Sequence, residues 1–206
     1  EACKAAASEP LVGLTFDGHV KPGLFQRRGP GASTARIAEA AQALLGSLSA
    51  EQRSTLTFPL DATERRMWFN IHPNVFRHGL LLESLTQQQR EAALAIVATT
   101  LSERGYRQAR DIMRLNGLLI EITKSNDEYG EWPYWFSIFG NPSAGEPWAW
   151  QIDGHHLNLN CTVLPDRIET AAHAGDVNLA VEGTFRFLER QSAAAGALAA
   201  WLARAH

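Results

Sequence analysis

Apolar residues recur three and four positions apart through the first half of the chain, as they do on one face of a helix. The first run follows Ser33 and Thr34 and contains Ile37, Ala41, Leu44, Leu45 and Leu48. Two later segments begin with the Ser/Thr-x-x-Gln pattern of a capping box, in which side chains satisfy the free backbone amides of the first turn. They are Ser49 to Gln52 and Thr86 to Gln89. The pattern predicts a helix after each of these three starts.

Further helical segments follow from the same spacing. Asp61 opens a short helix that ends near Trp68. The helix that starts at Thr86 continues to Leu101 and is predicted to stop at Gly105, because glycine favours helix C-termini. Another helix is predicted from Asp111 to Thr123. The middle of the chain therefore reads as helical throughout.

The pattern changes after Gly130, where aromatic and alternating residues indicate β-strands. Strands are predicted at Tyr134–Gly140, Trp148–Ile152 and His155–Leu164, with Asp153-Gly154 as a two-residue hairpin turn. Helices followed by strands, without βαβ alternation, are typical of α+β proteins. We therefore predict an α+β fold in which a helical N-terminal layer packs on a small antiparallel β-sheet.

The two ends of the chain differ from the middle. Residues 1–33 are rich in Gly and Pro towards their end, which predicts a lead-in to a single α+β domain over residues 34–206, with part of a longer domain as the alternative. The last segment is predicted to contain a strand at Thr184 to Leu188 and an Ala-rich helix with Leu198, Trp201 and Leu202 on one side. Glu1 to Ser8 lacks the basic and apolar regions of a secretory leader. A processed secretory protein would look the same, because its leader has been removed.

Composition narrows the classes of partner. Nineteen Lys and Arg against 22 Asp and Glu give a formal net charge of −3, which argues against a nucleic-acid-binding surface. No apolar run approaches the ~18–20 residues that a membrane span needs. The two cysteines, Cys3 and Cys161, could form one disulfide or remain free thiols, and the sequence leaves both states open. The oligomeric state is also left open, and a small molecule is the expected partner.

The segment Trp148 to Cys161 holds the main candidate site. Alternation along a strand would put His155 on the apolar face with Leu157 and Leu159, and a polar row of His156, Asn158, Asn160 and Thr162 on the other. Such a row suits a His-dependent or metal-assisted enzyme site. His156 would be a general base or metal ligand, His155 a second ligand or core anchor, and Asp153, Gln151 and Asn158 would support them, with a divalent transition metal ion as the cofactor.

Other interpretations of this region stay open. Both histidines could be simply hydrogen-bonded, and adjacent histidines on a strand diverge, so the doublet alone could not chelate one ion. His72 and His78 could add ligands. Glu64, Arg65 and Arg66 could bind a carboxylate, although a solvated helix face is the more common arrangement.

The tryptophans offer a different class of function. An aromatic cluster that includes Trp148 and Trp150 could stack a sugar or aromatic ligand in a non-catalytic binding module, although such clusters more often form core. Whether the protein is an enzyme is therefore not decided by its sequence.

Several motifs in a fixed order resemble the domain-of-unknown-function family numbered 3500. The resemblance covers roughly Ala35 to Val163. It rests on Glu64-Arg65-x-x-Trp68, Gly79-Leu80-x-Leu82, Leu85-Thr86-x-x-Gln89-Arg90, Leu101-Ser102-x-Arg104-Gly105-Tyr106, Tyr134-x-Phe136-Ser137-Ile138-Phe139-Gly140-x-Pro142-Ser143, and Trp148-x-Trp150-Gln151-x-x-Gly154-His155-His156-Leu157-x-Leu159-Asn160.

The resemblance implies a family in which secreted or extracytoplasmic bacterial members are common, and it gives no settled activity. Two departures stand out. Leu164 to Ile168 replaces the family's Thr-Pro-x-Phe type segment, and the chain ends at His206 without a further His-containing motif ahead of an Arg-Asp pair. If the family has a His-rich site that spans both regions, this chain carries only part of it.

Overall fold

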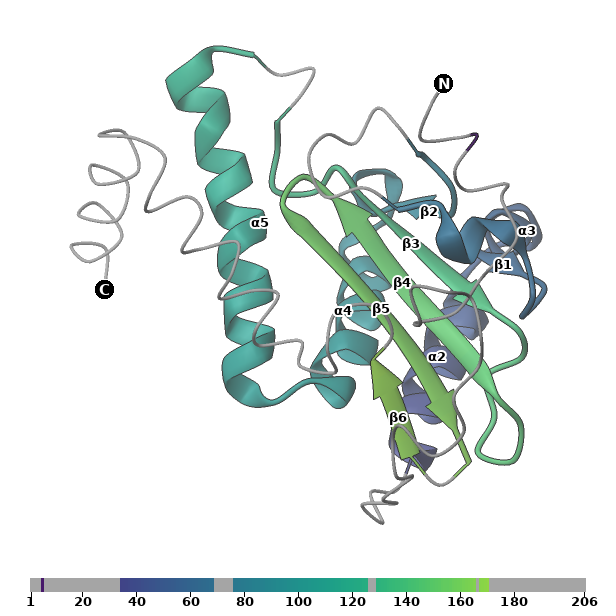
Figure 1. Ribbon diagram of the computed structural model, residues 1–206. Helices are drawn as coiled ribbons and strands as arrows, with labels where there is room; N and C mark the ends of the chain where they lie inside the picture. Colours follow the sequence, from purple (N-terminus) through teal and green to yellow (C-terminus); the bar gives the residue numbers. More distant parts are fainter. Residues whose placement is uncertain (1–4, 6–33, 69–75, 126–128, 166, 171–206) are drawn as a thin grey trace.

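The computed structural model describes Ala5 and residues 34–68, 76–125, 129–165 and 167–170 (Figure 1). The remainder of the predicted lead-in and the predicted strand and helix between Val181 and His206 lie outside the described residues. So do Cys3 and His72. The proposed division into a lead-in and one domain therefore stays a prediction.

The predicted helix starts are confirmed. Helix α2 spans Ala35–Ser47, α3 spans Ala50–Leu56 and α4 spans Gln87–Thr100. Both capping boxes are present: Ser49 and Thr86 each accept a hydrogen bond from the backbone of the Gln three residues later, whose side chain bonds back. Two short 3-10 helices, η1 (Thr63–Arg66) and η2 (Leu82–Ser84), complete the connections.

One predicted helix boundary is wrong. Gly105 does not end a helix but lies in the first turn of α5 (Glu103–Thr123), where its amide donates to the Ser102 hydroxyl at 3.1 Å. Because Ser102 caps this start, α5 begins eight residues before the predicted Asp111. The cap outweighs the cost of a glycine inside the helix.

The strands form one mixed sheet, mostly antiparallel. Its order is β1-β3-β4-β5-β6, with β2 also paired to β3, and only β1 runs parallel to its neighbour among the described strands. The strands are β1 (Thr57–Phe58), β2 (Leu80–Leu81), β3 (Tyr134–Phe139), β4 (Trp148–Gly154), β5 (Leu157–Leu164) and β6 (Arg167–Thr170). The α+β class and the three central strands are confirmed, whereas β1, β2 and β6 were not predicted.

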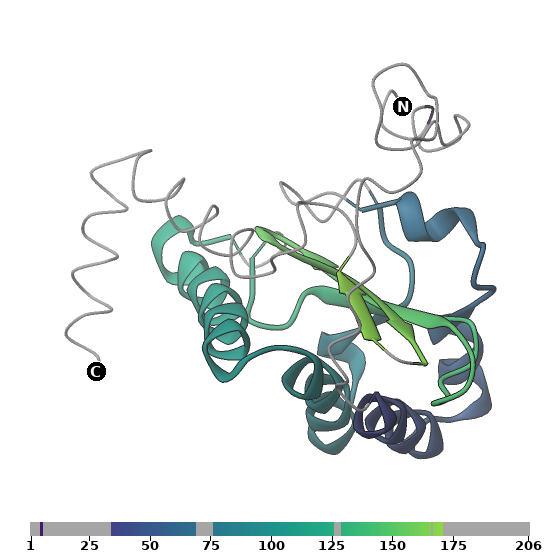
Figure 2. The same cartoon turned by 60° about the horizontal axis from the view of Figure 1, so that its bottom comes forward.

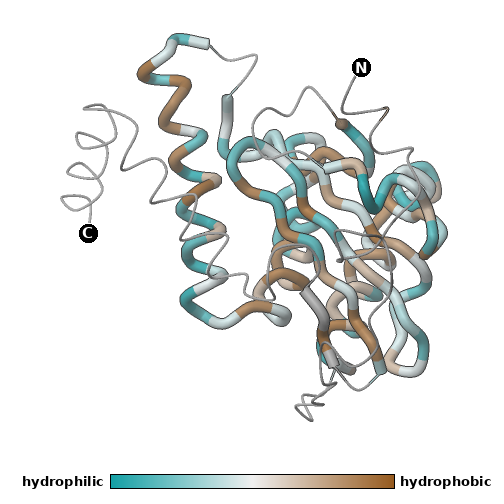
Figure 3. The backbone as a smooth tube through the Cα atoms, in the orientation of Figure 1, coloured by the Kyte–Doolittle hydropathy of each residue, from teal (hydrophilic) through white to brown (hydrophobic). Residues whose placement is uncertain are grey.

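The hydrophobic core lies on one face of this sheet. Helices α2, α4 and α5 lie along that face, as the rotated view in Figure 2 shows. Along β3 to β5, every second residue belongs to the core and the residues between them face the other side of the sheet. Figure 3 shows this as hydrophobic and hydrophilic positions that follow one another along these strands. Trp148, Trp150 and Ile152 of β4 pack into the helix-side core. The opposite face is therefore left for other side chains.

Cys161 of β5 points into the core as a free thiol, 3% exposed. Burial raises its pKa from 9.0 to about 12, which lowers the thiolate fraction at pH 8 about a thousandfold. In a Cys3→Ser background, we therefore expect the native protein to react very slowly with a thiol-specific disulfide reagent, and the guanidinium-unfolded protein to react at once. An equal rate in both states would contradict the burial of this thiol.

Candidate functional site

The histidine doublet lies in a turn and not on a strand. Strand β4 includes Asp153 and ends at Gly154, which pairs with Leu157 at the start of β5, so His155 and His156 form the two-residue hairpin turn. His156 adopts the left-handed conformation, with φ of 57°. The predicted Asp153-Gly154 turn is therefore wrong by two residues, and so is the prediction that the two histidines point to opposite faces of a strand.

Gly154 is needed for packing and not for a turn. A Cβ atom at this position would lie 2.2 Å from Cδ1 of Tyr134, because the tyrosine ring lies directly over the glycine. Tyr134 and Gly154 are cross-strand partners in β3 and β4. The Tyr134 hydroxyl also donates to the His155 carbonyl at 3.0 Å. The aromatic residue thus holds the end of the hairpin, and the local Asp-Gly signal is overridden.

The two imidazoles lie together at the tip of the hairpin. Their ring centroids are 4.0 Å apart. Nδ1 of His155 lies 2.8 Å from Oδ1 of Asn116 in α5. Because the amide nitrogen of Asn116 donates to the Gly130 carbonyl, the amide oxygen is the atom that accepts from His155. Burial lowers the pKa of His156. His155 is therefore an anchor between the hairpin and α5, half-buried beside Tyr129 and not in the apolar core.

No group of three or more His, Cys, Asp or Glu side chains is placed to hold a metal ion within the part of the chain that the structure describes. His155 already uses one ring nitrogen on Asn116. The described geometry gives the predicted metal site no further ligand.

The predicted polar row on β5 is present on the face opposite the helices. Asn158, Asn160 and Thr162 are half-buried there, alternating with buried apolar residues. On β4, Gln151 pairs in register with Asn160, and Asp153 with Asn158. Gln151 is 2% exposed and Asp153 is 4% exposed. Three predicted site residues, Gln151, Asp153 and Asn158, therefore meet on one face, while His156 stays at the turn.

These polar side chains form one continuous hydrogen-bonded row. The amide nitrogen of Gln151 donates to Asn160, and that of Asn160 donates to Asn158. Asn158 in turn donates to the Asp153 carboxylate at 2.7 Å. At the other end, His78 Nε2 lies 2.7 Å from the Gln151 oxygen. We call His78, Gln151, Asn160, Asn158 and Asp153 the amide row.

Loop residue His78 is held at the edge of this face. Its backbone carbonyl accepts from the Ser137 hydroxyl at 3.3 Å, and its ring contacts those of Phe58 and Phe139. Burial lowers the pKa of His78, against smaller raising effects from the Gln151 hydrogen bond and the Glu64 charge. The uncharged imidazole is therefore favoured near neutral pH.

Trp148 and Trp150 are core residues, with 0% and 1% of their surface exposed. Trp150 stacks on Phe136, with ring centroids 5.8 Å apart and an interplanar angle of 7°. A ring that is already covered on its faces cannot serve as an open platform for a sugar. The two rings therefore do not form the predicted stacking surface, and they match the core alternative.

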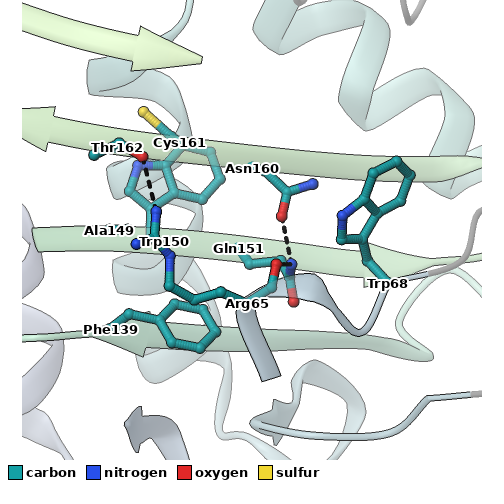
Figure 4. Close-up of a pocket in the computed structure, with 9 residues that line it drawn as sticks. All are labelled: Arg65, Trp68, Phe139, Ala149, Trp150, Gln151, Asn160, Cys161 and Thr162. Carbon is teal, nitrogen blue, oxygen red and sulfur yellow. Dashed lines mark hydrogen bonds between the residues drawn. The ribbon is translucent and has the colours of Figure 1, made fainter. Parts of the chain in front are cut away.

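A small pocket lies beside the amide row, with a cavity volume of about 60 Å³ (Figure 4). Ala149 makes room for it, since this small residue lies in register between Phe139 and Thr162. Trp68 stands at one end and Arg65 reaches across from η1. The complete lining is Arg65, Trp68, Phe139, Ala149, Trp150, Gln151, Asn160, Cys161 and Thr162.

Arg65 brings a half-buried positive charge to this pocket. Its guanidinium donates to the Thr162 hydroxyl at 3.0 Å and to the Leu60 carbonyl at 3.0 Å. These bonds use two of the five N–H groups of a guanidinium. Burial lowers the pKa of Arg65, and no carboxylate among the described residues forms an ion pair with it. The expected solvated helix face is therefore wrong for Arg65.

Comparison with known families identifies the chain. The family model described as "Protein of unknown function (DUF3500)" matches residues 30–181. The chain belongs to this family. The DUF3500 match confirms the resemblance found in the sequence motifs, and it includes the whole amide row, Arg65 and the pocket. No curated protein and no solved structure matches the chain.

Within the DUF3500 segment, sequence reasoning underestimated two residues. Arg65 was considered as a possible carboxylate-binding residue but given less weight than a solvated helix face, and His78 was considered only as an added metal ligand, yet both border the same sheet face. Arg65 is the second residue of Glu64-Arg65-x-x-Trp68, and its partner Trp68 lines the pocket as well. The spacing of these two residues, with Arg65 on the short helix η1 and Trp68 just after its end, was the available signal. No helix of the described residues is long and apolar enough to span a membrane.

Proposed function

We propose that this DUF3500 protein binds a small organic carboxylate in the pocket beside the amide row. The observation that carries the proposal is the half-buried Arg65 guanidinium, which lies at a pocket without a carboxylate of the described chain as its ion-pair partner. A desolvated cation is costly unless an anion compensates it. A ligand carboxylate would supply that compensation.

The other lining residues suit the same ligand. The planar guanidinium binds a carboxylate through two parallel hydrogen bonds, which favours this group over a point anion. Thr162 and Leu60 fix the guanidinium, so little side-chain entropy remains to be lost on binding. Phe139 and Trp68 provide apolar walls for the carbon part of the ligand.

The experiment is a titration of the full chain with sodium benzoate, followed by calorimetry and tryptophan fluorescence. Trp68 lines the pocket, so we expect a saturable fluorescence change. Arg65→Gln should weaken binding at least about tenfold, because a hydrogen bond to a charged group contributes ~1.5–3 kcal/mol. Arg66→Gln, at the exposed neighbouring position, should bind as the wild type does.

Two further titrations define the ligand class. Inorganic phosphate should bind more weakly than benzoate if the site recognises a planar carboxylate. Benzyl alcohol, which has no carboxylate, should not bind. Absence of saturable benzoate binding, or equal binding by Arg65→Gln, would overturn the proposal. A catalytic role for His156 in the hairpin turn stays a separate prediction, to be tested by His156→Ala once a substrate is known.

A further inference from the structure

Thr162 of β5 lines the pocket beside Arg65, and its hydroxyl oxygen is already engaged. Nη2 of Arg65 donates to this oxygen at 3.0 Å (Figure 4). A threonine hydroxyl has one proton and two lone pairs, so this bond leaves the proton free to be donated. No group that the structure describes accepts that proton. Thr162 therefore presents an unused hydrogen-bond donor next to the guanidinium.

The side-chain amides of the pocket are turned towards other protein groups. The Gln151 nitrogen donates to the side-chain oxygen of Asn160 and to the backbone carbonyl of Arg65. The Asn160 nitrogen donates to Asn158. A ligand that took a bond from Gln151 would leave a protein acceptor without its partner, which costs free energy. The Thr162 hydroxyl can donate to a ligand without such a loss.

The bond between Arg65 and Thr162 decides where this hydroxyl can act. Of the five guanidinium N–H groups, one goes to Thr162 and one to the Leu60 carbonyl, which leaves three for a ligand carboxylate. The N–H group directed at Thr162 is not among those three. The hydroxyl therefore lies to the side of a carboxylate held by Arg65, where it can reach an acceptor on the adjacent carbon of the ligand, C2.

We propose that the pocket selects carboxylates with an oxygen on C2, which are 2-oxo and 2-hydroxy acids, and that Thr162 determines this specificity. Arg65 holds the carboxylate while the Thr162 hydroxyl donates to the C2 oxygen. An acid without that oxygen would cover the half-buried hydroxyl and leave its proton unpaired, which disfavours binding. The inference rests on the proposed function, because it names the class of acid that the same pocket takes.

The experiment compares three small acids that differ only at C2. Pyruvate has a carbonyl there, L-lactate has a hydroxyl, and propionate has neither. Each is titrated into the full chain by calorimetry. We expect the wild type to bind pyruvate about threefold to tenfold more tightly than propionate, as one hydrogen bond contributes. Lactate binding equal to that of pyruvate would support both classes of acid, and lactate binding equal to that of propionate would support 2-oxo acids alone.

Thr162→Val removes the hydroxyl and keeps a β-branched side chain that suits a strand, so the fold should be retained, as circular dichroism can check. The change also removes an anchor of Arg65, which can alter the affinity for every acid. The readout is therefore the preference for pyruvate over propionate, since a purely structural role would move both affinities together. We expect Thr162→Val to bind the two acids equally and Thr162→Ser to keep the preference.

Glu169 offers a control, because it lies opposite Thr162 in the register of β5 and β6. Glu169→Gln removes a charge at this position and keeps the size of the side chain. It should retain the preference for pyruvate. Loss of the preference in Glu169→Gln would assign the discrimination to that carboxylate and overturn the role of Thr162.

Failure of this inference differs from failure of the proposed function. Equal binding of all three acids by the wild type, or an unchanged preference in folded Thr162→Val, would overturn the inference. If benzoate then still binds and Arg65→Gln still weakens it, the carboxylate site stands without the selection at C2. If neither benzoate nor any of the three acids shows saturable binding, the site and its specificity are both wrong.

Discussion

Gly79→Ala should lower the free energy of unfolding by about 2–5 kcal/mol, the sum of a left-handed backbone cost and an overpacking cost. Gly79 has φ of 89°, a conformation that favours glycine. A Cβ atom there would lie 2.2 Å from both the Phe136 carbonyl oxygen and the Ser137 hydroxyl. Neither can move freely, because both belong to β3, which is paired with other strands on both of its edges.

The same change should also displace the neighbouring His78 from Gln151. Guanidinium unfolding followed by circular dichroism measures the stability, and the NMR signals of His78 report its position. Gly46→Ala is the matched control, since no atom lies within 4 Å of a Cβ at this exposed position of α2. It should stabilise the protein by about 0.5–1 kcal/mol through helix propensity. Wild-type stability of Gly79→Ala would show that the close approach is not tight in solution.

Trp150→Ala should cost about 3–5 kcal/mol, as removal of a large core aromatic does elsewhere. The Trp150 side chain is 1% exposed and stacks on Phe136. It extends from β4, the middle strand of the sheet, into the hydrophobic core. Its loss leaves a cavity that the rigid sheet cannot close. The measurement is again the midpoint of guanidinium unfolding, read by circular dichroism because the change removes a fluorophore.

Trp150→Phe is the graded control for this effect. It keeps an aromatic ring on Phe136 and removes only part of the volume, so its cost should be clearly smaller than that of Trp150→Ala. Equal costs for the two variants would mean that the stacking contributes little. A loss below about 1 kcal/mol for Trp150→Ala would contradict its place in the core, since that is the size of a typical surface effect at most.

The features that sequence predicted well are those decided by near neighbours. The capping boxes at Ser49 and Thr86 need only residues three positions apart, and both were found at their predicted places. The alternation of Asn158, Leu159 and Asn160 is equally local and gave the polar face of β5 correctly.

The features that sequence missed depend on distant partners. The hairpin turn moved to His155 and His156 because the ring of Tyr134, twenty residues earlier, lies on Gly154. The two-residue strand β1 exists only through its pairing with β3, far along the chain. Arg65 and His78 likewise reach the site through tertiary contacts with Thr162 and Gln151. No pattern within a short window encodes such contacts.

The two-faced central sheet also protects the protein against misalignment during folding. If β5 paired with β4 one residue out of step, Leu159 and Val163 would turn towards the polar side and the asparagines would be forced under the helices. Such a slipped pairing would lose apolar burial, and it would also leave buried side-chain amides without hydrogen-bond partners. The alignment that builds the hydrophobic layer is thus also the one that joins Gln151 to Asn160, so a correctly packed molecule carries the amide row already assembled.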